Sequence, residues 1–227
     1  MIDKVLKKAS RIVTEAANKR RLGREGMSFL APNYIFFDEF NANSVVVDVG
    51  CGAEAEFAIH MVTTHGLKAF GVDPTKKHFP ALAKLVDQND GKFVHVQKAV
   101  AREKGVITFH QSVDNESGSI LSDHNNIQND EIESYEVETL TITDLKALSD
   151  TGKVDYMKLD LEGAEYALLE GIEKATLEGI AQLFVEFHHH CVDSYSIEDT
   201  QAIVENIVSV GMKAYTVDQH NYLFAWK

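Results

Sequence analysis

The sequence has few of the features that mark secreted or membrane-bound proteins. It holds two cysteines, three prolines and one tryptophan among 227 residues. Two cysteines, Cys51 and Cys191, form no disulfide framework, so we expect a reduced, cytoplasmic protein. No apolar run is long enough for a membrane span or a signal-peptide core, so we expect no membrane partner. The length fits one large domain with a sizeable core.

Basic residues are scarce as well. The chain has 22 Lys and Arg against 35 Asp and Glu, a net charge of −13. This balance disfavours nucleic acid, because neutralising phosphates requires basic patches, and we expect no nucleic-acid partner. Residues 1–25 are the exception, with eight basic and three acidic side chains. We interpret them as the solvated face of a helix; a docking arm for RNA is the less favoured alternative.

Hydrophobic periodicity predicts two parts. Residues 2–20 carry an amphipathic helical stripe, and the aromatic segment 31–40 is expected to form a second helix. Together they predict an N-terminal helical cap over residues 1–43. From residue 44 to 227, strands alternate with helices, and the chain ends in two strand-like runs around a polar turn. We predict strands near 44–49, 68–72, 92–98, 154–160 and 181–187, and helices near 54–65, 76–88, 164–174 and 197–210.

This alternation predicts an α/β fold whose seven-stranded, mostly parallel sheet has helices on both faces and ends in an antiparallel hairpin. The polar stretch 111–134, followed by a strand-like run over 135–142, interrupts the pattern. A loop of this length is either disordered or a functional lid, and the sequence leaves both open.

Polar groups gather where the predicted strands end. "VVVDVGCG" (45–52) is a buried strand that ends in Asp48 and a turn with Gly50 and Gly52. Asp73 follows the next strand, at a place where a carboxylate can accept both hydroxyls of a ribose. Ligands of open α/β sheets bind beyond these carboxyl ends, so we expect a nucleotide-type cofactor there.

Later strand ends add Asp160 and Glu162, and then Glu186 and His188. Ala55 stands where a dinucleotide-binding turn has its third glycine, which argues against an NAD-dependent dehydrogenase but leaves it as an alternative. S-adenosylmethionine carries a sulfonium and an ammonium and no phosphate, so an acidic rim suits it electrostatically.

Several blocks in this order resemble the FkbM-type family of S-adenosylmethionine-dependent methyltransferases. They include "VVVDVGCG", "GVDP", "KAVAREKGVITF", "LFVEFHHH" and, most specifically, the 158–165 block "KLDLEGAE", which is similar to the family's K-x-D-x-E-G-x-E signature. The resemblance covers about residues 44–227. It implies a Rossmann-like class I methyltransferase fold and methyl transfer, usually to a hydroxyl of a small molecule or sugar.

For the cofactor, we predict binding by Asp48, Gly50, Gly52, Glu54, Asp73 and Asp160. Glu54 departs from the family, which usually has glycine there, and it either binds the cofactor's ammonium, turns to solvent or lowers affinity. A non-catalytic domain that binds a ligand or partner is therefore an alternative function.

For catalysis, we predict His188 as the base that takes the hydroxyl proton, oriented by Glu186 or Asp160. Asp160, Glu186, His188 and His190 could together suit a divalent metal, but no tight ligand spacing supports one, and we expect none. The oligomeric state is open: residues 34–40 pack on their own domain or on a second copy in a homodimer.

Overall fold

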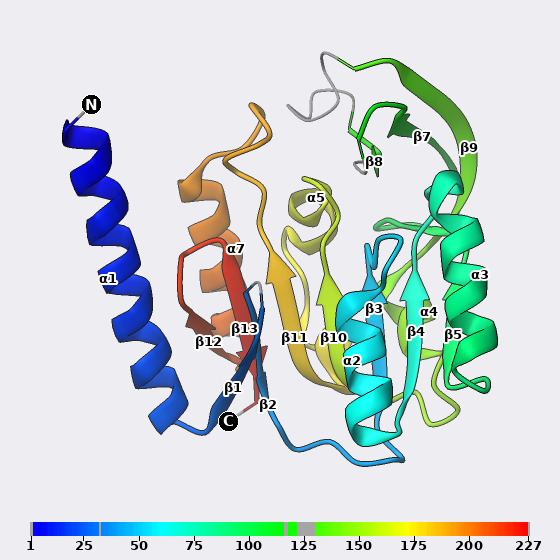
Figure 1. Ribbon diagram of the computed structural model, residues 1–227, viewed down its shortest axis with the longest axis horizontal. Coiled ribbons are helices and arrows are strands. Elements are labelled where there is room, and N and C mark those ends of the chain that lie inside the picture. Colours follow the sequence, from blue (N-terminus) through cyan, green and yellow to red (C-terminus); the bar gives the residue numbers. More distant parts are fainter. Residues whose placement is uncertain (1, 32, 116–117, 122–129, 227) are drawn as a thin grey trace.

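The computed structural model describes residues 2–31, 33–115, 118–121 and 130–226, of which residues 2–11 are described by their backbone alone (Figure 1). No helix within these ranges is long and apolar enough to cross a membrane. The chain forms one large sheet, a smaller four-stranded sheet and an N-terminal hairpin.

The large sheet confirms the predicted seven strands. Their order is β12-β13-β11-β10-β3-β4-β5. The five strands from β11 to β5 pair in parallel, and β13 lies antiparallel between β11 and β12. The bounds are β3 Val45–Val49, β4 Lys68–Val72, β5 Phe93–Val96, β10 Val154–Leu159, β11 Ile180–Glu186, β12 Lys213–Thr216 and β13 Asn221–Ala225. Every carboxyl end of the parallel strands therefore faces the same edge.

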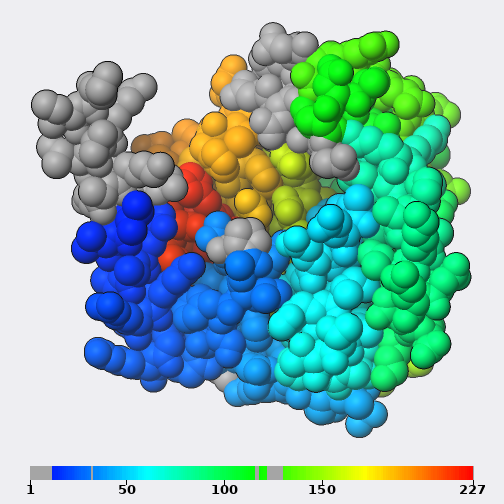
Figure 2. All heavy atoms as spheres, in the orientation of Figure 1, coloured from blue at the N-terminus to red at the C-terminus, as the bar shows by residue number. Residues whose placement is uncertain are grey.

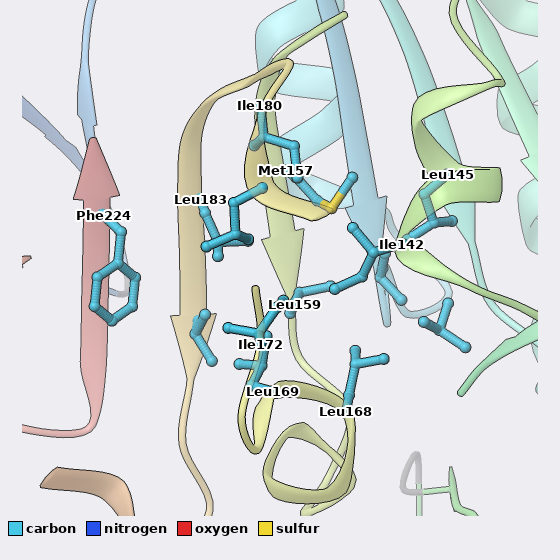
Figure 3. Packing of buried hydrophobic residues seen from close by; sticks show 14 of the residues in the cluster. Ile142, Leu145, Met157, Leu159, Leu168, Leu169, Ile172, Ile180, Leu183 and Phe224 are labelled. Carbon is cyan, nitrogen blue, oxygen red and sulfur yellow. The ribbon is translucent and has the colours of Figure 1, made fainter. Parts of the chain in front are cut away.

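Two apolar clusters cover the two faces of this sheet. Neighbouring strand residues alternate between them: Val47 belongs to one and Val46 to the other. Figure 3 shows part of the first cluster, where Met157, Leu159 and Leu183 of the sheet meet side chains from flanking helices. The helices are α2 Glu56–His65, α3 Phe79–Gln88 (after the 3-10 turn Lys76–His78), α4 Ile142–Lys146, α5 Glu165–Leu169, α6 Lys174–Leu177 and α7 Ile197–Ser209.

The N-terminal part differs from the predicted pair of helices. Helix α1 spans Ile2–Arg24, as predicted, but the helix expected over 31–40 is wrong. That region holds β2, Tyr34–Phe37, which pairs antiparallel with β1, Met27–Leu30. Aromatic and β-branched residues favour a strand on a half-buried surface, and here the sheet supplies that surface. Figure 2 shows this segment in blue beside α2 in cyan and α3 in green on one face of the molecule.

Two side chains of the large sheet hold β2 in place. The amide of Gln182 donates to Phe37 O and its oxygen accepts from Phe37 N, at 3.0 and 2.8 Å. The buried Tyr156 hydroxyl donates to Ile35 O at 3.0 Å. Residues 27–37 therefore contribute to the domain's own core rather than forming a helical cap.

The smaller sheet has the order β6-β9-β7-β8, with β6 Ala99–Val100, β7 Val106–Ser112, β8 Gly118–Ser119 and β9 Ile132–Leu140. It lies beyond the carboxyl ends of β4 and β5 (Figure 1). The Tyr135 hydroxyl donates to Pro74 O, and Ser119 Oγ donates to Glu162 O, each bond joining this sheet to a loop at that edge. Much of the predicted lid, residues 116–117 and 122–129, lies outside the described residues.

Candidate active site

The turn after β3 places two glycines at the edge of the sheet. Gly50 has φ +69°, and a Cβ on it would lie 1.9 Å from Asp160 O, so only glycine fits. Gly50 N also donates to Val72 O at 2.9 Å, which holds the turn against the end of β4. The close approach of this turn to the β10 end explains why the sequence has glycine here.

Lys158, which the sequence analysis did not single out, lies beneath this turn. It is 2% exposed, and its Nζ lies 3.2 Å from Asp48 Oδ1, 3.1 Å from Asp160 Oδ2 and 2.9 Å from Gly50 O. Burial opposes the charge, but Asp160 and Asp48 outweigh it and raise the pKa of Lys158. The available signal was the spacing in the sequence: Lys158 lies two residues before Asp160, so the two side chains point to the same side of the chain where β10 ends.

Asp48 is also buried, at 1% exposure, and its other oxygen accepts from Ala58 N of α2. Burial raises the pKa of Asp48, and the ammonium of Lys158 opposes that rise. Asp48 ties β3 to α2 and does not line the cavity described below. Its predicted contact with the cofactor stays a prediction; the geometry makes it a support of the turn.

Asp73 ends β4 and joins two loops. Its Oδ2 accepts from Gly52 N at 2.9 Å and lies 3.2 Å from His78 Nδ1; its Oδ1 accepts from Thr75 N. Burial would raise the pKa of Asp73, but the bonds from His78 and Thr75 outweigh it and lower the value. The carboxylate is therefore ionised at neutral pH. His78, five residues further on in a 3-10 turn, was not found from the sequence.

These strand ends surround a cavity of about 520 Å³. The smaller sheet contributes Phe109 and Gly118 to its wall, and Tyr34 of β2 contributes an aromatic ring. Of the predicted site residues, Gly50, Gly52, Glu54, Asp73 and Asp160 line the cavity, and Asp48, Glu186 and His188 do not. Glu162, noted after strand β10 but assigned no role, lines it too.

His188 lies behind the wall formed by Asp160 and Glu162. It is 5% exposed; Nδ1 lies 3.0 Å from Glu165 Oε1, and Nε2 lies 3.5 Å from Asp160 and 3.7 Å from Glu162. Burial opposes a charged ring, but Glu165 first and then the other carboxylates raise the pKa of His188 well above its usual range. His188 does not line the cavity, and its predicted role as the base stays a prediction.

Glu165, which was not predicted, holds His188 at 3.0 Å, and of the two predicted partners Asp160 lies 3.5 Å from the ring. Glu165 is fully buried, and its two oxygens accept from Leu161 N at 2.6 Å and Gly163 N at 3.0 Å. Glu186 is half-buried; burial first and Asp160 next raise its pKa to about 7. His190 stacks on His188 with ring centroids 6.1 Å apart. Of the four residues considered as metal ligands, Asp160 and His188 group with Glu165 among the described residues, and Glu186 and His190 do not belong to that group.

The sheet order is that of the Rossmann-like class I methyltransferase fold, and the acidic cavity lies at the carboxyl edge of this sheet. Residues 43–208 match the FkbM methyltransferase domain, and the chain belongs to that family. No curated protein sequence matches the chain.

Solved structures with the same general arrangement are distant. They include a Methanococcus jannaschii fibrillarin described as a pre-rRNA processing protein (10% identity, 88% of this chain and 70% of that chain, TM-score 0.49). Another is a Streptococcus pneumoniae putative tRNA (m1A22) methyltransferase in complex with S-adenosyl-L-methionine (10% identity, 82% and 65%, TM-score 0.43). At such similarity they carry no argument about this protein's substrate.

Proposed function

We propose that the protein transfers a methyl group from S-adenosylmethionine to a hydroxyl of a small molecule. The observation that supports this most is the meeting of Glu54, Asp73, Asp160 and Glu162 around one cavity of about 520 Å³. That volume falls in the usual range for small-ligand sites. Carboxylates attract a cofactor that carries a sulfonium and an ammonium, and they repel the phosphate of a nucleotide.

The proposed cofactor contacts follow from the geometry of the loops. Asp73 is ionised and fixed by the amides of Gly52 and Thr75, so its carboxylate is pre-positioned for a ribose hydroxyl. Gly52 lines the cavity, and open space lies where its side chain would be, so a ligand can approach the backbone of the turn closely. Glu54 is exposed at the cavity and is the carboxylate that we assign to the cofactor's ammonium.

The acceptor side of the cavity carries Asp160 and Glu162. When bound, the cofactor supplies an electrophilic methyl group. The protein's task is to align the acceptor oxygen with it and to remove a proton. We assign the hydroxyl hydrogen bond to Asp160, since it lines the cavity and is held by Lys158 at 3.1 Å. A positioned proton acceptor contributes roughly 10²–10⁴-fold in rate. His188 then acts as a positioning residue for Asp160 and Glu162.

A small acceptor fits better than RNA. Phe109 and Gly118 of the smaller sheet line the cavity opposite the turn of β3, and the chain's net charge is −13. A phosphate backbone would meet acidic side chains at this edge without the basic patches that it needs. The charge and the enclosure therefore support a compact, hydroxyl-bearing substrate.

The first test is calorimetry with S-adenosylhomocysteine on the wild type, on Asp73→Asn and on Asp87→Asn, an exposed aspartate of α3 that serves as the matched control. We expect binding to the wild type and the control. Loss of one charged hydrogen-bond partner should weaken binding by about tenfold to a hundredfold in Asp73→Asn. Absence of binding to the wild type, or equal binding by all three proteins, would contradict the proposal.

The second test is turnover on a panel of hydroxyl compounds, measured as release of S-adenosylhomocysteine. Asp160→Asn should lower kcat while leaving a folded protein by circular dichroism. A protein that binds the cofactor product but turns over nothing would favour the non-catalytic alternative, for which Glu54 in the place of glycine is the supporting observation.

A further inference from the structure

Three side chains behind the acceptor wall have the composition of a metal site. One ligand atom each from Asp160, Glu165 and His188 lies within 4.8 Å of the others. Ligands of one octahedral cation with bonds of about 2.1 Å lie about 3 Å apart when adjacent and about 4.2 Å apart when opposite. The three atoms are therefore near the spacing that a bound cation imposes. Two carboxylates and an imidazole suit Mn²⁺, Mg²⁺ or Zn²⁺.

The donors are held in place by the surrounding structure. Glu165 is fully buried: Oε1 accepts from Leu161 N and lies 3.0 Å from His188 Nδ1, and Oε2 accepts from Gly163 N and keeps a lone pair for a cation. Lys158 fixes one oxygen of Asp160 and leaves the other directed to His188. Asp160 directly follows β10, Glu165 begins α5, and His188 is the second residue after β11. Three different elements therefore fix the positions of the three ligands. A site of this kind needs little rearrangement to bind an ion.

Charge is a separate observation that favours a cation here. The neighbourhood holds five carboxylates and two basic groups, an excess of three negative charges when all are ionised: Asp48, Asp160, Glu162, Glu165 and Glu186 against Lys158 and His188. With His188 neutral as a ligand the excess is four negative charges, and a divalent cation would halve it.

We propose that Asp160, Glu165 and His188 bind a divalent cation such as Mn²⁺ or Mg²⁺, and that His188 releases a ring proton to water when its nitrogen coordinates the ion. Asp160 lines the cavity, whereas Glu165 and His188 are buried behind it, so the ion lies behind the acceptor wall and reaches the cavity through Asp160. There the ion would hold the Asp160 carboxylate in the orientation in which it accepts the hydrogen bond of the acceptor hydroxyl. This role rests on the proposed function, whereas the binding of the cation does not.

The test is a Mn²⁺ titration of the full chain after chelator treatment, followed by electron paramagnetic resonance without cofactor. We expect one ion per chain, and a loss of about tenfold or more in affinity for His188→Gln and Asp160→Asn. His189→Gln is the matched control. The His189 ring is next to His188 in the sequence, but it is not one of the proposed ligands and forms a hydrogen bond with Thr200. Circular dichroism and the melting temperature report whether each variant folds.

The outcomes separate the two proposals when S-adenosylhomocysteine binding is measured on the same samples. Mn²⁺ binding that His188→Gln and Asp160→Asn lose but the control keeps supports the site, even if the cofactor product fails to bind and the proposed function falls. Failure of Mn²⁺ to bind while the cofactor product binds overturns the site and leaves the methyltransferase, with His188 as a protonated clamp. Equal Mn²⁺ binding by every variant also overturns the site.

Discussion

Replacing Lys158 with methionine removes the only basic side chain within 4 Å of Asp48 in the described part of the chain. Lys158 is 2% exposed and Asp48 is 1% exposed, so the remaining carboxylate is left without its counter-charge in the core. Breaking one partner of a buried pair costs about 3–5 kcal/mol. For a protein of this size each kcal/mol lowers Tm by about 2–4 °C, so we expect a decrease of roughly 6–20 °C.

The pH dependence of this loss gives the reasoning a sharper check. The pKa of Asp48 is already raised from 3.8 in the folded protein, chiefly by burial, and loss of Lys158 raises it further. A carboxyl with a raised folded pKa takes up a proton on folding at pH values between its unfolded and its folded pKa. Its stabilising contribution is therefore present at low pH and is lost as pH rises through the folded pKa. The deficit of Lys158→Met should shrink as pH falls toward 3.8 and be largest above the folded pKa.

The assay is urea unfolding at several pH values, with the double variant Lys158→Met/Asp48→Asn completing a cycle. Neutralising the acid should restore part of the lost stability, since the unpaired charge is gone. A single variant as stable as the wild type, or a deficit that does not change with pH and is not relieved by Asp48→Asn, would show that the pair is not coupled as the distances imply.

Three further outcomes are expected. Gly50→Ala should cost more than about 1–3 kcal/mol, the usual scale of left-handed strain, because its Cβ meets Asp160 O; thermal unfolding checks this, and wild-type stability refutes it. Ser196→Ala should lose about 0.5–2 kcal/mol in urea, since its hydroxyl caps α7 by accepting from Asp199 N; an unchanged midpoint contradicts the capping role. Mobility-shift assays should show no RNA binding at 150 mM salt, and tight binding that falls steeply with salt and is lost on deleting residues 1–25 would revive the docking-arm interpretation.

The sheet was predictable because local patterns and long-range packing agree in it. The run Val45–Val49 is buried on both faces, which is what a continuous β-branched sequence in a parallel strand indicates. The segment 31–40 was not predictable in the same way. Its aromatic run fits either secondary structure by periodicity, and the choice is made by Gln182, 145 residues away, which pairs with the backbone of Phe37.

The acidic edge of the site was predictable from the sequence, but the hydrogen bonds among its side chains were not. Strand ends placed Asp73 and Asp160 at one cavity, because parallel strands share their carboxyl edge. Sequence spacing could not show that Glu165 turns inward: a glutamate in the first turn of a helix usually only favours the helix dipole. Here the loop before α5 folds back, so that the Glu165 carboxylate accepts from Leu161 N and Gly163 N and also contacts His188.

The spacing of the 158–165 block now has a physical account at each position. Lys158 and Asp160 share a face of β10, so one ammonium can fix the acid at the cavity. Gly163 has φ +101°, and a Cβ there would lie 2.6 Å from Val192, so the chain can turn only with glycine. The turn sends Glu162 to the cavity wall and Glu165 to the core, on opposite sides of the His188 ring. A substitution that moves either acid therefore changes the acceptor wall through the same imidazole, which couples a buried residue to the chemistry at the surface of the cavity.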